Sequence, residues 1–266
     1  MAGQIRVGIG GWTYEPWRDG VFFPQKWPAK RELEYASRKL TAIEVNGTYY
    51  SGFKPPTFKK WHDETPEDFV FTLKASRFCT NRKVLAEAGE SVTRFVSQGI
   101  VELGPKLGPI LWQFMATKKF DPVDMGAFVN LLPASQDGVP LRHAIEVRHD
   151  SFNHPEFLAM CRAAGVAIVF ADSSKYPGIA DVTGDFVYAR LEDAKPEVET
   201  GYTTTELDRW AAIARSWAAG QAPDGLPYVD QASHTPALAR DVFVFMINGA
   251  KERAPASAMA LIERVK

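Results

Sequence analysis

Apolar residues gather in short runs along the chain, and most runs end in a polar or charged residue. The runs are mostly continuous rather than alternating, as expected of parallel strands covered on both faces. Each run is therefore predicted to be a buried strand. The predicted strands are residues 5–10, 42–46, 69–74, 109–114, 144–148, 167–172, 186–191 and 242–248.

Helical patterns lie between the predicted strands. Thr203 and Glu206 form a capping-box pattern that opens one helix, and Gly165 and Gly220 lie where glycines commonly end helices. The sixth connection, 173–185, contains Pro177 and Gly178 and leaves room for at most one short helix. The predicted helices are 29–40, 56–63, 91–103, 123–131, 155–164, 203–219 and 255–265.

Repeated strand–helix units over this length predict an α/β fold, a single (β/α)8 TIM barrel spanning residues 1–266 with an irregular sixth unit. A doubly wound open sheet is the alternative. Its dinucleotide fingerprint is missing, because the bulky Trp12 follows Gly10 and Gly11 where the backbone would have to approach a ligand closely.

Composition narrows the class of protein. The chain has 266 residues, is 45% hydrophobic and carries a net charge of -1, so a dedicated nucleic-acid binder is not expected. Cys79 and Cys161 lack metal or disulfide-framework spacing and are predicted to be buried thiols. With no apolar run of about 18 residues and no signal-type start, a cytoplasmic enzyme without membrane contact is expected.

In a TIM barrel, reactive side chains lie at the carboxyl ends of the strands. Strand alternation places both residues of several pairs on the inner face at this end, although a one-residue slip of phase would turn a pair outward. The pairs are Glu44 with Asn46, Thr72 with Lys74, Glu146 with Arg148, Phe170 with Asp172, Tyr188 with Arg190, and Met246 with Asn248.

Three carboxylates and three cations are thus expected to converge on one mouth, where neighbouring charges shift pKa values apart for acid–base work. The alternative is a salt-bridge network that only organises the barrel; six such residues at one end favour a ligand site. The predicted catalytic residues are Glu44, Lys74, Glu146 and Asp172. The predicted substrate-binding residues are Trp12, Tyr14, Asn46, Gln113, Arg148, Arg190, Asn248 and Lys251.

Two of these assignments have simpler structural alternatives. Trp12 and Tyr14 belong to an aromatic-rich loop that can wall a pocket or form a small satellite core. Lys251 precedes the last helix, where TIM barrels often bind phosphate, and is equally compatible with a solvated surface position. His149 and His154 have no ligand spacing, so no metal site is predicted.

Several motifs together resemble the YecE-like family (domain of unknown function 72), a TIM-barrel family, and span nearly the whole chain in order. The resemblance implies the fold and little chemistry. Asn81 and Glu192 stand where many members have histidine. The motifs are GGWTYEPW at 10–17, IEVNGTYY at 43–50, LKASRF at 73–78, LGPILWQF at 107–114, EVRH at 146–149, ADS at 171–173, YARL at 188–191 and NGAKERAP at 248–255.

The leading functional hypothesis is an enzyme for a small anionic substrate that bears phosphate or carboxylate. Glu146 or Glu44 would be the acid or base beside Lys74, and isomerase, lyase and hydrolase chemistry all fit. One alternative is a metal-dependent phosphoesterase with a divalent metal on Glu44, Glu146 and Asp172. Another is a non-catalytic barrel that binds a metabolite or, less readily, a nucleic-acid end. The leading hypothesis needs no cofactor.

Overall fold

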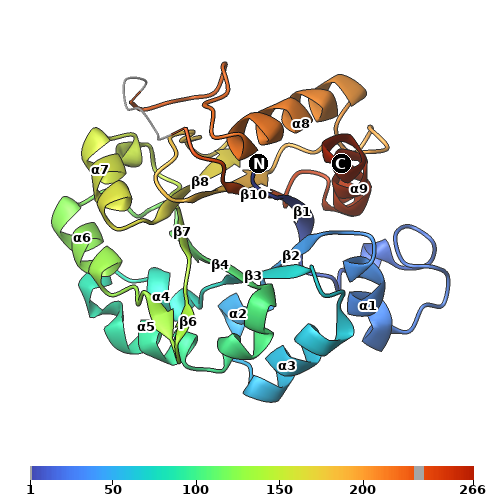
Figure 1. Ribbon diagram of the computed structural model, residues 1–266, viewed down its shortest axis with the longest axis horizontal. Coiled ribbons are helices and arrows are strands. Elements are labelled where there is room, and N and C mark those ends of the chain that lie inside the picture. The colour runs from blue at the N-terminus through green and yellow to red at the C-terminus, as the bar shows by residue number, and fades with distance from the viewer. Residues whose placement is uncertain (1, 231–236) are drawn as a thin grey trace.

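The computed structural model describes residues 2–230 and 237–266. Within them, eight parallel strands close into a barrel in the order β1-β10-β9-β8-β7-β4-β3-β2, and helices surround it (Figure 1). This confirms the predicted TIM-barrel fold. The strands are β1 (Ile5–Gly10), β2 (Ala42–Val45), β3 (Val70–Lys74), β4 (Leu107–Gln113), β7 (His143–Glu146), β8 (Ala167–Asp172), β9 (Phe186–Leu191) and β10 (Asp241–Met246).

Three strands, β1, β8 and β9, coincide with their predicted bounds. The predicted strands 144–148 and 242–248 end two residues early, at Glu146 and Met246. In both cases the chain leaves the ladder just where the polar residues of the mouth begin. Arg148 and Asn248 therefore belong to loops, which gives them more freedom than residues paired in the sheet.

The longer helices follow the sequence pattern with few exceptions. Thr203 caps α8 through the predicted box, accepting from the Glu206 N–H while the Glu206 carboxylate accepts from the Thr203 N–H. The predicted helix 91–103 is two elements, because Gly99 takes a φ of 105° between α5 and a 3-10 segment. The helices are α1 (Glu32–Ser37), α2 (Gly47–Tyr50), α3 (Pro55–Glu64), α4 (Arg77–Thr80), α5 (Gly89–Val96), α6 (Pro122–Asn130), α7 (Pro155–Ala163), α8 (Thr204–Ala218) and α9 (Ala254–Val265).

One connection agrees with the prediction, and another contains an element that was not predicted. Residues 173–185, all described, contain no helix, in keeping with the predicted irregular sixth unit. A small hairpin, β5 (Ser135–Gln136) with β6 (Val139–Pro140), was not predicted. Its turn residues, Asp137 and Gly138, both have positive φ, as a two-residue hairpin turn requires.

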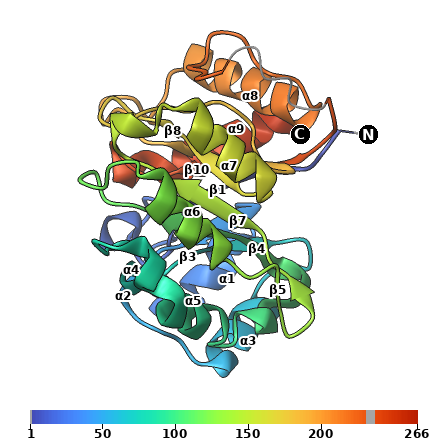
Figure 2. The same ribbon diagram turned by 90° about the vertical axis from the view of Figure 1, so that its left-hand side faces the viewer.

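Two apolar layers, one inside the barrel and one outside it, show which side chains face the barrel axis. The inner cluster contains Phe243, Phe245 and Tyr188, whereas their neighbours Val244 and Met246 pack in the outer layer beneath the helices. Figure 2 shows the helices that cover this layer from the side, with α6 and α7 along the barrel and α8 next to α9. Among the described residues, no helix is long and apolar enough to cross a membrane.

Candidate functional site

The inner faces of four strands carry polar side chains at the carboxyl end of the barrel. Strand register pairs Glu44 on β2 with Thr72 on β3, and Gln113 on β4 with Glu146 on β7. Because residues paired in register share a face, all four point toward the barrel axis. The convergence of Glu44, Thr72 and Glu146 matches the inward phase predicted for β2, β3 and β7.

Arg190 on β9 is the centre of the ion-pair network at the mouth and is 2% exposed. Its Nη1 donates to Glu146 Oε2 at 2.6 Å and to Glu192 Oε1 at 2.9 Å. Its Nε and Nη2 donate to the two carboxylate oxygens of Glu44 at 3.1 and 3.2 Å. Burial opposes the charge, but the three carboxylates outweigh it and raise the pKa of Arg190 above its ordinary value.

The carboxylate of Glu146 is fully buried and fully engaged. It accepts from Gln113 Nε2 at 2.9 Å on both oxygens and from Arg148 Nε at 2.8 Å, in addition to Arg190. Burial raises the pKa of this carboxyl, but the charges of Arg190 and Arg148 outweigh that effect and hold it below its usual value. Glu146 is therefore held as an anion that anchors two arginines.

Glu44 is anchored from the opposite side of the barrel. Tyr188 Oη donates to Glu44 Oε2 at 2.8 Å, and Thr72 Oγ1 lies 2.9 Å from the same hydroxyl. Burial, and then the charge of Glu44, raise the pKa of Tyr188 well above its ordinary value, so the phenol remains a donor. The chain Thr72–Tyr188–Glu44 fixes one wall of the network.

Glu192 joins the network although it was not among the predicted site residues. It is buried beyond the end of β9, bonded to Arg190, and Arg148 Nη2 lies 3.8 Å from Oε1. Asn248 donates to it from the loop after β10. Burial raises the pKa of its carboxyl above the usual value. The signal was present in the sequence, since Tyr188, Arg190 and Glu192 continue one alternation.

Lys74, at the end of β3, differs from the other charged groups of the mouth. It is 9% exposed, and its Nζ lies 4.4 Å from the centre of the Tyr49 ring. Within residues 2–230 and 237–266, no carboxylate lies within ion-pair distance of this amine. Burial, and then the charge of Arg190, lower the pKa of Lys74 to about 8, although Glu44 and Glu146 oppose the shift.

Asp172 does not face the barrel interior, and the inward phase predicted for Phe170 and Asp172 is wrong. Phe170 packs outward against Trp210 and Trp217 of α8, with ring centres 5.9 and 5.7 Å apart. Asp172 shares that face, and Val169 fills the interior instead. Burial, and then the charge of Asp193, raise the pKa of Asp172 to about 6. The Asp172 carboxyl is thus turned away from the barrel interior, where Glu44 and Glu146 bond Arg190.

The phase predicted for Met246 is also wrong, because Met246 packs in the outer layer while Ile247 lies in the inner cluster. Asn248 still reaches the mouth, because it lies on a loop and bonds Glu192. Asn46 is half-buried and lies against Gly10, where a Cβ would come within 2.8 Å of Asn46 Nδ2. Glycine at position 10 therefore makes room for the Asn46 amide.

The aromatic loop after β1 packs mainly against its own side chains and neighbouring helices. Trp12 contacts Trp61 edge-on at 5.3 Å and Phe71 at 6.4 Å. Lys251 Nζ lies 4.5 Å from the centre of the Tyr14 ring and forms no ion pair with any residue in the described part of the chain. These contacts match the satellite-core alternative for Trp12. Tyr14 and Lys251 contact each other and Trp17 of the same loop.

The three carboxylates considered as metal ligands do not come together. Glu44 and Glu146 share the Arg190 guanidinium, whose charge lies where a cation would bind, and Asp172 faces outward. In the part of the chain that the structure describes, no three His, Cys, Asp or Glu side chains are grouped to hold a metal ion. His149 and His154 instead accept backbone N–H bonds at the starts of helical segments.

These features define the class of protein as a parallel α/β barrel whose carboxyl-end mouth is lined by buried charges, most of them ion-paired. Residues 6–266 match the family described as "Protein of unknown function DUF72", and the chain belongs to this family. The resemblance inferred from the motifs is thereby confirmed.

Relatives support the family assignment at the level of sequence and fold. The chain is 28% identical over 152 residues to UPF0759 protein YecE of Escherichia coli (strain K12), covering 56% of this chain and 50% of that protein. It therefore spans about half the length of the curated relatives it matches.

Two solved structures of DUF72 family proteins share the fold. The protein of Thermotoga maritima MSB8 is 23% identical, with a TM-score of 0.72 and 98% of each chain covered. The protein of Enterococcus faecalis V583 is 18% identical, with a TM-score of 0.73 and coverage of 98% of this chain and 95% of that one. At these identities the likeness concerns the barrel, and chemistry must be argued from the site itself.

Proposed function

We propose that this protein is an enzyme that binds a small phosphate- or carboxylate-bearing substrate at the barrel mouth and moves a proton with Lys74. The proposal rests on the burial of the Lys74 amine and on its lack of an ion-pair partner among the described residues. The amine is buried at the carboxyl end of a barrel strand, and it is not ion-paired by any described carboxylate. Burying a cation without an ion-pair partner is costly. An anionic ligand beside the Lys74 amine would therefore be stabilised by charge attraction and by hydrogen bonds from that amine.

Arg148 is the second group suited to hold the substrate anion. Its side chain is 18% exposed, and its guanidinium lies 4.3 Å from the centre of the Tyr176 ring. The guanidinium is anchored to Glu146 through Nε, and its Nη2 lies 3.8 Å from Glu192 Oε1, so Nη1 is the group best placed to bind a ligand. Arg190 is suited to a different role, because its bonds to three carboxylates leave it as the fixed centre that orients Glu44 and Glu146.

Lys74 is also the group best placed for acid–base work. A pKa of about 8 lets the amine carry a proton at neutral pH and release it without a large penalty. The charged groups acting on it are Arg190, Glu44, Glu146 and Arg148. Glu146 is a poorer base than the sequence suggested, since its pKa is lowered and both oxygens already accept two bonds.

The proposal is tested by thermal shifts of the purified protein against phosphorylated and carboxylated metabolites. A ligand that binds only the folded state adds about 2.7 kcal/mol of stability at a hundredfold excess over Kd. We expect one anion class to raise the Tm, with the rise lost in Arg148→Ala and Lys74→Met. The matched control is Arg38→Ala, an exposed arginine that pairs with Glu34 on α1 and should keep the full shift.

A negative result is equally specific. If no anion shifts the unmodified protein, or if both mouth variants keep the full shift, the mouth is a structural ion-pair network and the proposed function is wrong. Turnover of an identified ligand by the unmodified protein, with loss of turnover in Lys74→Met, would assign the proton transfer to Lys74.

A further inference from the structure

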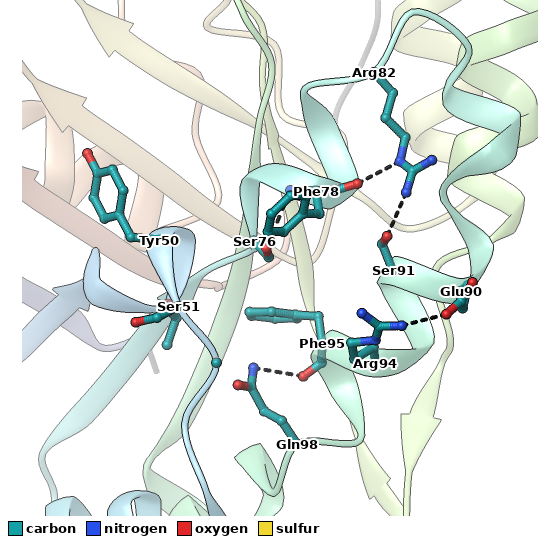
Figure 3. A pocket seen from close by; sticks show the side chains of 12 residues that line it. Tyr50, Ser51, Ser76, Phe78, Arg82, Glu90, Ser91, Arg94, Phe95 and Gln98 are labelled. Atoms are coloured by element: carbon teal, nitrogen blue, oxygen red, sulfur yellow. Dashed lines mark hydrogen bonds and ion pairs between the residues drawn. The ribbon is translucent and has the colours of Figure 1, made fainter.

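A cavity of about 450 Å³ lies beside the mouth, between the loops after β2 and β3 and helix α5 (Figure 3). Its volume is in the range of small-molecule sites. It shares a wall with the mouth, because Thr48 lines the cavity while its hydroxyl donates to the Lys74 carbonyl oxygen at 2.7 Å. None of the predicted site residues lines this cavity.

One positively charged side chain is held rigidly in the cavity wall. Arg82 donates from Nε to the Phe78 carbonyl oxygen at 2.6 Å and from Nη2 to Ser91 Oγ at 2.7 Å, as Figure 3 shows. Within the described ranges, no carboxylate lies within ion-pair distance of this guanidinium. Arg82 therefore presents a positioned charge with donor groups still available, the arrangement that binds anions bidentately.

Next to Arg82 the cavity offers flat apolar surface. The Phe78 side chain is 60% exposed, although large aromatic side chains are usually covered in folded proteins. Phe95 from α5 is buried and forms part of the same wall. A ligand with an aromatic ring would cover Phe78 and gain the burial that the protein alone leaves unused.

The other arginine that lines the cavity, Arg94, is exposed and already ion-paired. Arg94 pairs with Glu90 one turn earlier on α5, and the two side chains are 79% and 84% exposed. An exposed pair of this type contributes little and is screened by solvent. Arg94 is therefore a matched control for Arg82, because it has the same residue type and lines the same cavity.

We propose that this cavity is a second binding site, separate from the barrel mouth, for a small aryl anion. The ring packs on Phe78 and Phe95, and the anionic group binds the guanidinium of Arg82. The site does not depend on the proposed chemistry at Lys74, since its lining residues take no part in the network around Arg190.

Calorimetric titration with naphthalenesulfonate tests the site, with neutral naphthalenesulfonamide and inorganic sulfate as matched probes. We expect the sulfonate to bind at one site per chain, and the sulfonamide and sulfate to bind at least about tenfold more weakly, since each lacks one of the two contacts. Arg82→Gln should weaken the sulfonate by about tenfold or more, and Arg94→Gln should change its affinity by less than about twofold.

Two further variants make the test decisive. Phe78→Ala removes an exposed ring, so it should fold normally and weaken the sulfonate by several fold even if Arg82→Gln does not fold. Arg148→Gln alters only the mouth and should leave sulfonate binding unchanged. Equal binding of sulfonate and sulfonamide, unchanged affinity in Arg82→Gln and Phe78→Ala, no binding of sulfonate, or loss of binding only in Arg148→Gln would each overturn the proposal.

Discussion

The Nη1 atom of Arg190 lies 2.6 Å from Oε2 of Glu146, inside a barrel where both side chains are almost completely buried. The same guanidinium also bonds Glu44 and Glu192, so one cation neutralises much of three carboxylates. Buried charges of this kind are tolerated only as a set, because each relies on its partners to offset the loss of water.

Removing the central cation should therefore be costly. Arg190→Met is expected to lower the free energy of unfolding by about 3–5 kcal/mol, since the carboxylates that it bonds would be left buried without compensation. Urea denaturation near neutral pH measures the change. Arg38→Met removes an exposed arginine and should cost less than about 1 kcal/mol. A similar small loss for both variants would show that Arg190 does not organise the mouth.

Asp172 should destabilise the fold at neutral pH. Its pKa is raised to about 6 from an ordinary 3.8, so the folded state disfavours the ionised carboxylate, and this cost appears as pH rises through that interval. Asp172→Asn is expected to raise the free energy of unfolding by about 1–2 kcal/mol at about pH 7.5, allowing for partial exposure. Measured at decreasing pH, this gain in the free energy of unfolding should shrink to zero at about pH 4. A gain that does not change with pH would contradict the assignment.

Trp12 should act through packing rather than through ligand contact. Its edge-on contacts with Trp61 and Phe71 lead us to expect that Trp12→Ala costs about 2–4 kcal/mol of stability, whereas Trp12→Phe costs clearly less. Thermal or urea unfolding gives the cost, and titration with any ligand of the mouth gives the affinity. Unchanged stability together with lost affinity would make Trp12 a wall of the binding site instead.

The fold and several charged residues of the mouth could be predicted, because the sequence patterns that indicate them are local. Strand alternation placed Glu44, Lys74, Glu146 and Arg190 on inner faces, and the structure brings them together. The capping box of α8 was likewise visible, because it depends on two residues three positions apart. Such features can be predicted without knowing which other elements pack against them.

The phase of β8 could not be predicted in the same way. Residues 167–171 are all apolar, so no alternation distinguishes the inner from the outer face. The phase is set by α8, whose Trp210 and Trp217 cover Phe170 and thereby turn Asp172 outward. Glu192 was not predicted because it lies one residue beyond β9, where the apolar run that marks the strand has ended.

The central claim, that Lys74 is a buried amine available for an anion and a proton, is tested most directly by titrating that amine. Isotope-labelled reductive methylation and NMR follow each lysine, and Lys74→Arg identifies the resonance. Because burial lowers the pKa, we expect a midpoint of about 8, with the charge that holds an anion lost as pH rises through this value. A midpoint of about 10.4, as for a solvated lysine, would contradict this claim.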